Sequence, residues 1–208
     1  MKRFGSAVLL LALVGAMAAV PASAGTLYDN TTASSYTLAG YYDQSGYTYY
    51  SITDSFTLSS AATITGATFA SWTDPGATVS GMQWAIGNSA FGTNLASGWQ
   101  SNPYTGYIGS YYGYWDIDSN AVSIGSLLLG AGTYWLTLSN GTATDYGTVA
   151  WDESNGPSSA IDLGYGDIFS ETFTIQGNTG VTPEPSSLLF LGSGLAALAG
   201  MLRRKVRV

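Results

Sequence analysis

The charged residues of this chain are distributed very unevenly. From Gly25 to Leu202 there is no Lys, Arg, His or Cys, whereas all 13 acidic residues of the chain lie in that range. No salt bridge to Lys or Arg and no disulfide can therefore form there. A fold in this region has to rest on burial of apolar side chains and on backbone hydrogen bonds. Nucleic-acid binding is excluded, because it depends on neutralising phosphates with basic side chains.

Residues 1–24 have the pattern of a secretory signal peptide. Its basic, apolar and small-residue parts stand in the expected order: Lys2 and Arg3, residues 7–20, and Ala22 with Ala24 at the cleavage site. We expect a signal helix that signal peptidase removes, so that the secretion machinery exports a mature chain beginning at Gly25. An uncleaved membrane anchor is the alternative, but the apolar run is shorter than the roughly 20 residues that a span usually needs.

The other end of the chain contains a second apolar segment. Residues 186–202 carry no charge, and as a helix rising about 1.5 Å per residue they would be roughly 25 Å long. This length is the lower limit for crossing a bilayer, so we predict a single C-terminal transmembrane helix. The basic residues after it predict a cytoplasmic C-terminus. The region between the two ends is then expected in the periplasm, tethered to the inner membrane.

The last 30 residues, 179–208, combine three parts in a specific order. These are a Pro-Glu-Pro motif, an apolar segment rich in small residues and a basic cluster: Pro183, Glu184 and Pro185, then residues 186–202, then Arg203, Arg204 and Lys205. This order resembles the PEP-CTERM sorting signal of bacterial surface proteins. The resemblance implies an exosortase that recognises the tail and cleaves it near Pro-Glu-Pro, in bacteria that make exopolysaccharide. It also implies a final location at the cell surface or outside the cell. A plain tail-anchored protein is the alternative.

Residues 25–178 are expected to form one extracytoplasmic domain. Only 9% of the chain is charged, but 13% is aromatic, and disordered chains lack aromatic residues. Apolar and polar residues alternate with period two. Some eight short strands predict an all-β, two-sheet antiparallel sandwich, for which we prefer a jelly-roll-like topology. Residues 131–138 and 151–159 also resemble the sandwich ectodomain of PEP-CTERM proteins, and this resemblance implies no particular activity.

Three local features of this domain can be tested against a structure. Asp54 interrupts the apolar face of its strand between Ile52 and Phe56, which predicts a bulge or an edge there. Gly66 is expected to form a bulge, because the apolar residues before and after it have opposite parity. Residues 87–121 are rich in Gly, Asn, Ser and Tyr and are predicted to be long loops around short strands.

The missing residue types exclude most familiar catalysis. Without His, Cys or an internal Lys, the chain lacks the parts of a Ser-His-Asp triad, a Cys nucleophile, a Schiff base and the usual zinc site. A pair of carboxylates, as in glycoside hydrolysis, remains, and Glu153 and Glu171 are the glutamates available before the tail. Asp152 and Glu153 would point to opposite faces of a strand and could not flank one bond. We therefore expect no catalytic residues and no enzyme activity.

Three oxygen-bearing side chains at alternate positions form a candidate calcium site: Asp116, Asp118 and Asn120. Ala121 and Leu127 stand where an EF-hand needs Gly and Glu, so the segment is not an EF-hand. An acidic strand or turn facing solvent is the alternative. A second acidic group could add oxygen ligands if the fold brings it together: Asp152, Glu153 and Asp162. No other cofactor is expected.

Four aromatic residues in glycine-rich sequence are candidates for glycan contact: Tyr111, Tyr112, Tyr114 and Trp115. Tyr111 and Tyr112 are adjacent and cannot both point inward on a strand, so some of these rings should be exposed. Exposed Tyr and Trp can stack on sugar rings. The alternative is that the rings cover the ends of the core.

Two functions from different classes follow from these observations. The first is an exported, membrane-tethered and exosortase-sorted protein of the cell surface or extracellular matrix, with a structural or adhesive role linked to exopolysaccharide. The second is a lectin-like carbohydrate-binding module that uses exposed Tyr and Trp, with or without calcium.

Overall fold

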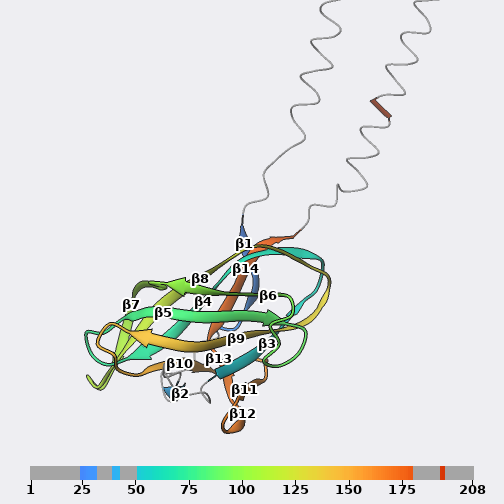
Figure 1. Cartoon of the computed structure of the whole chain (residues 1–208). Coiled ribbons are helices and arrows are strands. Elements are labelled where there is room, and N and C mark those ends of the chain that lie inside the picture. The colour runs from blue at the N-terminus through green and yellow to red at the C-terminus, as the bar shows by residue number, and fades with distance from the viewer. Residues whose placement is uncertain (1–23, 32–38, 43–50, 180–192, 195–208) are drawn as a thin grey trace, which may run out of the picture.

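The structure, a computed structural model, describes residues 24–31, 39–42, 51–179 and 193–194. Within these residues the chain is nearly all β and forms two antiparallel sheets, as expected for a sandwich (Figure 1). The alternation of apolar and polar residues explains this arrangement, because each strand buries one face against the opposite sheet.

The first sheet is built around the long strand β4 (Ala62–Thr73). One edge of β4 pairs with β8 (Trp115–Leu129), and the other pairs with β14 (Phe173–Thr179) and β10 (Val149–Ser154). Four further strands extend this sheet: β1 (Gly25–Asp29) beside β14, β2 (Ala39–Tyr42) and β13 (Ser170–Glu171) beside β10, and β7 (Tyr104–Tyr111) beside β8.

The second sheet has six strands in the order β12-β11-β3-β9-β5-β6. Their bounds are β12 (Gly166–Ile168), β11 (Ala160–Asp162), β3 (Ser51–Leu58), β9 (Gly132–Ala143), β5 (Val79–Gly87) and β6 (Ala96–Ser101). The strands β3, β9 and β5 form the centre of this sheet and carry much of its buried face.

The main core lies between the sheets and contains a group of aromatic rings. Phe173 from the first sheet is fully buried, and its ring centroid lies 6.5 Å from that of Phe56 and 5.7 Å from that of Trp151. A second, smaller apolar cluster covers the outer face of the first sheet: Ala70, Trp72, Ile117 and Ala150, with Tyr111 and Trp115 packed against them. We call this group the outer cluster.

The predicted bulge at Gly66 is confirmed, because the register between β4 and β8 shifts between Ile64 and Gly66. The prediction of long loops in residues 87–121 is wrong. The strands β6 and β7 occupy much of that range, and β8 begins within it. The strands β6 and β7 lie at sheet margins and have one exposed face, so their Gly, Ser and Tyr residues do not need the apolar alternation of a central strand.

The two ends of the domain lie together, since Gly25 at the start of β1 pairs with Gly177 near the end of β14 (Figure 1). The predicted signal helix and the transmembrane segment 186–202 lie outside the described residues, apart from Ser193 and Gly194, which are helical. None of the helical residues that the structure describes belongs to a helix long and apolar enough to span a membrane.

Candidate functional site

The predicted sorting and processing residues lie mostly outside the described part of the chain. Ala22, the Pro-Glu-Pro motif and the basic cluster at residues 203–205 are in this group. Ala24 is described, and it is exposed immediately before β1.

The predicted aromatic site is a tight hairpin between β7 and β8. The backbone N–H of Tyr114 donates to the carbonyl oxygen of Tyr111 at 3.0 Å. Tyr112 and Gly113 both have left-handed backbone, with φ of +49° and +72°. Two left-handed central residues are the signature of a type I′ turn. This conformation costs a residue other than Gly roughly 1–2 kcal/mol, so the hairpin holds Tyr112 in a strained position.

The hairpin separates the four aromatic candidates into two pairs. Tyr112 and Tyr114 are 80% and 75% exposed, which confirms that some of these rings face solvent. Tyr111 and Trp115 pack against the outer cluster, and the ring centroid of Tyr111 lies 5.1 Å from that of Trp72 and 4.5 Å from that of Tyr112. The partly buried pair therefore anchors the exposed pair.

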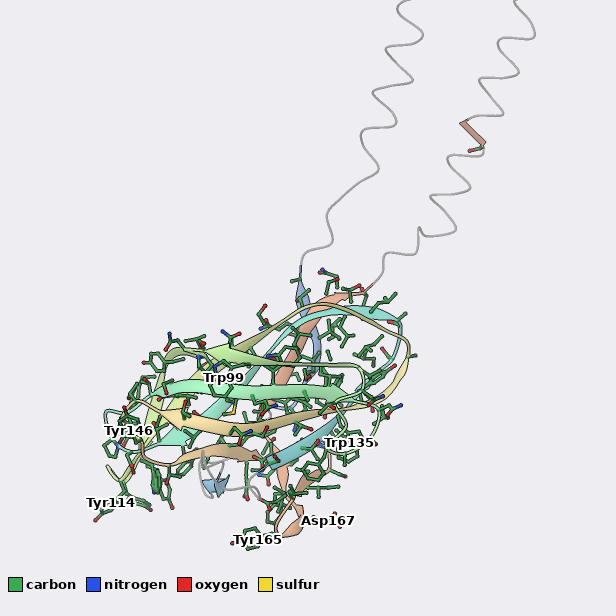
Figure 2. All side chains as sticks on the ribbon, in the orientation of Figure 1. Trp99, Tyr114, Trp135, Tyr146, Tyr165 and Asp167 are labelled. Atoms are coloured by element: carbon green, nitrogen blue, oxygen red, sulfur yellow. The ribbon has the colours of Figure 1, made fainter. Side chains whose placement is uncertain are left out.

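A further tyrosine stands at the same end of the molecule. Figure 2 shows Tyr146, in the loop between β9 and β10, at the end that also carries Tyr114. Tyr146 is 98% exposed and also has left-handed backbone, with φ of +64°. Sequence reasoning did not single out Tyr146, and its single occurrence in a polar loop gave no signal.

The candidate calcium residues lie at alternate positions of β8, opposite β4. Asp116 accepts a hydrogen bond from the backbone N–H of Gly76 at 2.7 Å. Asp118 is 2% exposed, and burial raises the pKa of its carboxyl. Asn120 is fully buried and donates to Ser71 Oγ at 2.8 Å. The alternative of a segment facing solvent is wrong for Asp118 and Asn120.

Across the described ranges, no group of three or more His, Cys, Asp or Glu residues is placed to hold a metal ion. The proposed trio of Asp116, Asp118 and Asn120 contains two acids and an amide and stays a prediction.

A more unusual group of acids lies inside the sandwich. Asp54 is fully buried in the middle of β3, which pairs with β9 and β11 without a register shift at this position. The prediction of a bulge or an edge at Asp54 is therefore wrong. Its neighbours Ile52 and Phe56 belong to the main core, so the carboxyl group faces the space between the sheets.

Asp54 is surrounded by hydrogen-bond donors. Its Oδ1 accepts from the backbone N–H of Ser55 at 2.6 Å. Its Oδ2 accepts from the backbone N–H of Glu171 at 2.7 Å, from Ser158 Oγ at 2.9 Å and from Ser170 Oγ at 3.2 Å. Burial raises the pKa of Asp54 to about 6, and these donors limit the increase.

Glu153 and Glu171 stand directly opposite each other on β10 and β13. They flank the core residues Trp151 and Phe173 at alternate positions, so both side chains face inward. Glu171 is fully buried, and neither of its carboxyl oxygens has a hydrogen-bond partner among the described residues. Burial raises the pKa of Glu171 well above its usual value, and the nearby carboxyl of Asp54 raises it further.

Asp162 completes this group from β11, where it pairs with the core residue Ile52. Its Oδ1 accepts from the backbone N–H groups of Gly164 and Tyr165 at 2.6 and 2.9 Å. Its Oδ2 is buried and has no partner among the described atoms. We call the four inward-facing acids the interior carboxylate cluster: Asp54, Glu153, Asp162 and Glu171.

Asp152 points to the opposite face from Glu153, as predicted. Its carboxylate accepts from Trp72 Nε1 at 2.6 Å and from Thr172 Oγ1 at 3.1 Å, and burial raises its pKa. Sequence reasoning thus grouped two members of the interior carboxylate cluster, Glu153 and Asp162, but did not add Asp54 and Glu171 to that group. Asp54 and Glu171 occupy core-facing positions beside buried apolar residues, but only the pairing of distant strands brings them to the other two acids.

A polar groove of about 450 Å³ adjoins the interior carboxylate cluster. It lies between the loop after β10 and the segment containing β12 and β13, and Ser158 and Ser170 line it. Because both hydroxyls also donate to Asp54, the groove is separated from the cluster by one layer of side chains.

Comparison with known protein families gives a match at the C-terminal end of the chain. A PEP-CTERM protein-sorting motif matches residues 181–205. No curated protein matches the chain. The motif indicates an exported, surface-located protein that is anchored in a membrane and processed by an exosortase. The match begins just after β14 and does not include the sandwich.

Proposed function

We propose that this exosortase substrate is a structural or adhesive protein of the cell surface or extracellular matrix, associated with exopolysaccharide. The observation that carries the proposal is the sorting motif at residues 181–205, which follows a sandwich ending at Thr179. In this proposal the signal peptide 1–24 directs export, the tail holds the domain on the outer side of the inner membrane, and exosortase then releases it to the surface.

The chemistry of the sandwich supports a role without catalysis. Glu171, one of the two glutamates that could serve in hydrolysis, is fully buried between the sheets. A general acid or base must reach the bond that it acts on. We therefore propose no enzymatic activity for Glu153 and Glu171.

Changing Pro183, Glu184 and Pro185 together to Ala should prevent sorting. We expect the surface-exposed fraction of the protein to fall at least tenfold and the protein to accumulate in the inner membrane with its tail intact. Cell fractionation and mass spectrometry of the mature C-terminus provide the measurement. Pro157→Ala, in the loop after β10, is the matched control and should be sorted normally. The proposal would be contradicted if the triple variant reached the surface as well as the wild type does and had the same mature C-terminus.

A carbohydrate-binding role is a second candidate, and the β7–β8 hairpin favours it. Strained backbone conformations cluster at functional sites, and Tyr112 combines left-handed backbone with an 80% exposed ring. The partly buried rings of Tyr111 and Trp115 fix the hairpin against the outer cluster. Such a rigid aromatic surface can stack on a sugar ring at a low entropic cost.

Binding of the protein to a glycan array, with and without Ca²⁺, tests this second candidate. Changing Tyr112 and Tyr114 together to Ala should weaken binding roughly tenfold, which corresponds to about 1.4 kcal/mol. Tyr165→Ala removes a ring that is 71% exposed and lies away from this hairpin (Figure 2), so it should have no effect. Tyr112→Gly removes the same ring but keeps the turn, because Gly adopts this backbone without strain. It therefore checks that a loss of binding does not come from a change in the fold. An array without signal in either condition would exclude the carbohydrate role.

A further inference from the structure

The interior carboxylate cluster has no counter-charge within the domain. Its four acids come from both sheets, and the chain contains no Lys, Arg or His between Gly25 and Leu202. Two like charges opposite each other on paired strands are destabilising, and buried charges normally need a partner. Either protons or a bound cation must therefore neutralise this part of the core.

The arrangement of Glu153 and Glu171 suits a shared ion. Directly opposed residues of an antiparallel pair have Cβ atoms about 5 Å apart, and both side chains point to the same side of the ladder. Two glutamate side chains in this position can bring their carboxylates to a common point. Glu153 is 8% exposed, whereas Glu171 is fully buried, so the pair leads from the surface inward.

A second observation points to a missing ligand at this place. Both carboxyl oxygens of Glu171 and one of Asp162 are buried without any hydrogen-bond partner among the described residues. Buried polar groups in native proteins are satisfied in the great majority of cases, and an exception calls for an ion or a water. Asp54 differs, because its two oxygens already accept four hydrogen bonds. Asp54 is thus a fixed acid beside the pair and not a free ligand.

We propose that the interior carboxylate cluster is a binding site for one hard divalent cation, Ca²⁺, held by Glu153 and Glu171. The unsatisfied groups offer oxygen ligands alone, and oxygen is the donor that Ca²⁺ prefers. Water molecules supply the remaining oxygen ligands. No described group of three acids is placed to hold a metal, so the affinity belongs in the range of extracellular calcium modules, about 10⁻⁴ to 10⁻³ M.

Thermal unfolding of the full exported chain tests the site. The melting temperature is measured at pH 7.5 in 1 mM EDTA and in 5 mM CaCl₂, at matched ionic strength. An ion that binds only the folded state stabilises it by mass action, and with the affinity given above the expected increase in melting temperature is about 4 °C. Isothermal titration should give one Ca²⁺ per chain.

Glu171→Gln and Glu153→Gln should each abolish the response to Ca²⁺. Both remove negative charge from a crowded site, so their melting temperatures in EDTA should equal or exceed that of the wild type. Asp167→Asn removes an exposed acid on the neighbouring β12 and should leave the response intact. Asp116→Asn tests the other candidate site on β8 and should also leave it intact.

Two results would overturn the inference. One is a wild-type melting temperature that does not change with Ca²⁺, which would mean that protons alone neutralise the cluster. The other is a response that survives in both glutamate variants or disappears in Asp116→Asn, which would place the ion elsewhere. Because Glu153 lies at the margin of the cluster, its variant keeps the test decisive even if Glu171→Gln fails to fold.

Discussion

When EDTA removes divalent cations, the protein should be most stable in mild acid and should lose stability as the pH rises to neutrality. The folded state raises the pKa of Asp54 to about 6 and that of Glu171 well above its usual value, in both cases mainly by burial. Groups with raised pKa bind protons more tightly when folded, so their stabilisation is complete below the unfolded pKa and is lost as the pH passes through the folded pKa. For Asp54 alone this loss is on the order of 3 kcal/mol between about pH 4 and pH 6.

Urea unfolding at pH 4.5, 5.5, 6.5 and 7.5 in EDTA would measure this effect. Glu171→Gln has no titrating group at position 171 and should lose less stability across the series than the wild type. Asp167→Asn, at an exposed position, should follow the wild-type curve. A free energy of unfolding that increases from pH 4.5 to pH 7.5 would show that the interior acids are ionised in the folded state without cost.

Phe173→Ala should be among the most destabilising single changes in the domain. The side chain is fully buried, and its ring lies 5.4 Å from that of Tyr28, 6.5 Å from Phe56 and 5.7 Å from Trp151. Removing a buried Phe costs about 3–5 kcal/mol, because the lost contacts are accompanied by a cavity. The remaining rings are large and come from both sheets, so they cannot easily close that cavity.

The control for this change lies four residues earlier. Phe169 is 64% exposed, so Phe169→Ala should alter the free energy of unfolding by less than about 0.5 kcal/mol. Chemical unfolding of both variants in the same buffer gives the comparison. Equal losses in the two variants would contradict the placement of Phe173 at the centre of the core.

Features that depend on neighbouring residues could be predicted from the sequence. In β9, Leu136 and Leu138 stand at alternate positions, and both are buried as predicted. The bulge at Gly66 was visible as a change of parity between flanking apolar residues. The exposure of some rings between Tyr111 and Trp115 was predicted from their adjacency, since neighbours on a strand face opposite sides.

The interior carboxylate cluster could not be predicted, because it depends on pairing between distant strands. An acid on an apolar face usually marks an edge, yet Asp54 lies in a central strand and accepts from the backbone of a residue 117 positions away. Glu153 and Glu171 meet through the register of two short strands, which no local pattern specifies. The buried position of Asp118 likewise depends on how β8 lies against β4.

The position of β14 determines how the domain would respond to a mechanical load. This strand lies between β1 and β4, with ladders on both sides, and the tail continues from its final residue, Thr179. A pull on the tail against a sandwich held elsewhere runs along β14, so both ladders must slide apart at once in shear. A pull between the tail and Gly25 would instead break the hydrogen bonds between β1 and β14 one after another, starting near the Gly25–Gly177 pair. The sandwich should therefore resist tension between a cell and its surroundings better than tension between its own two termini.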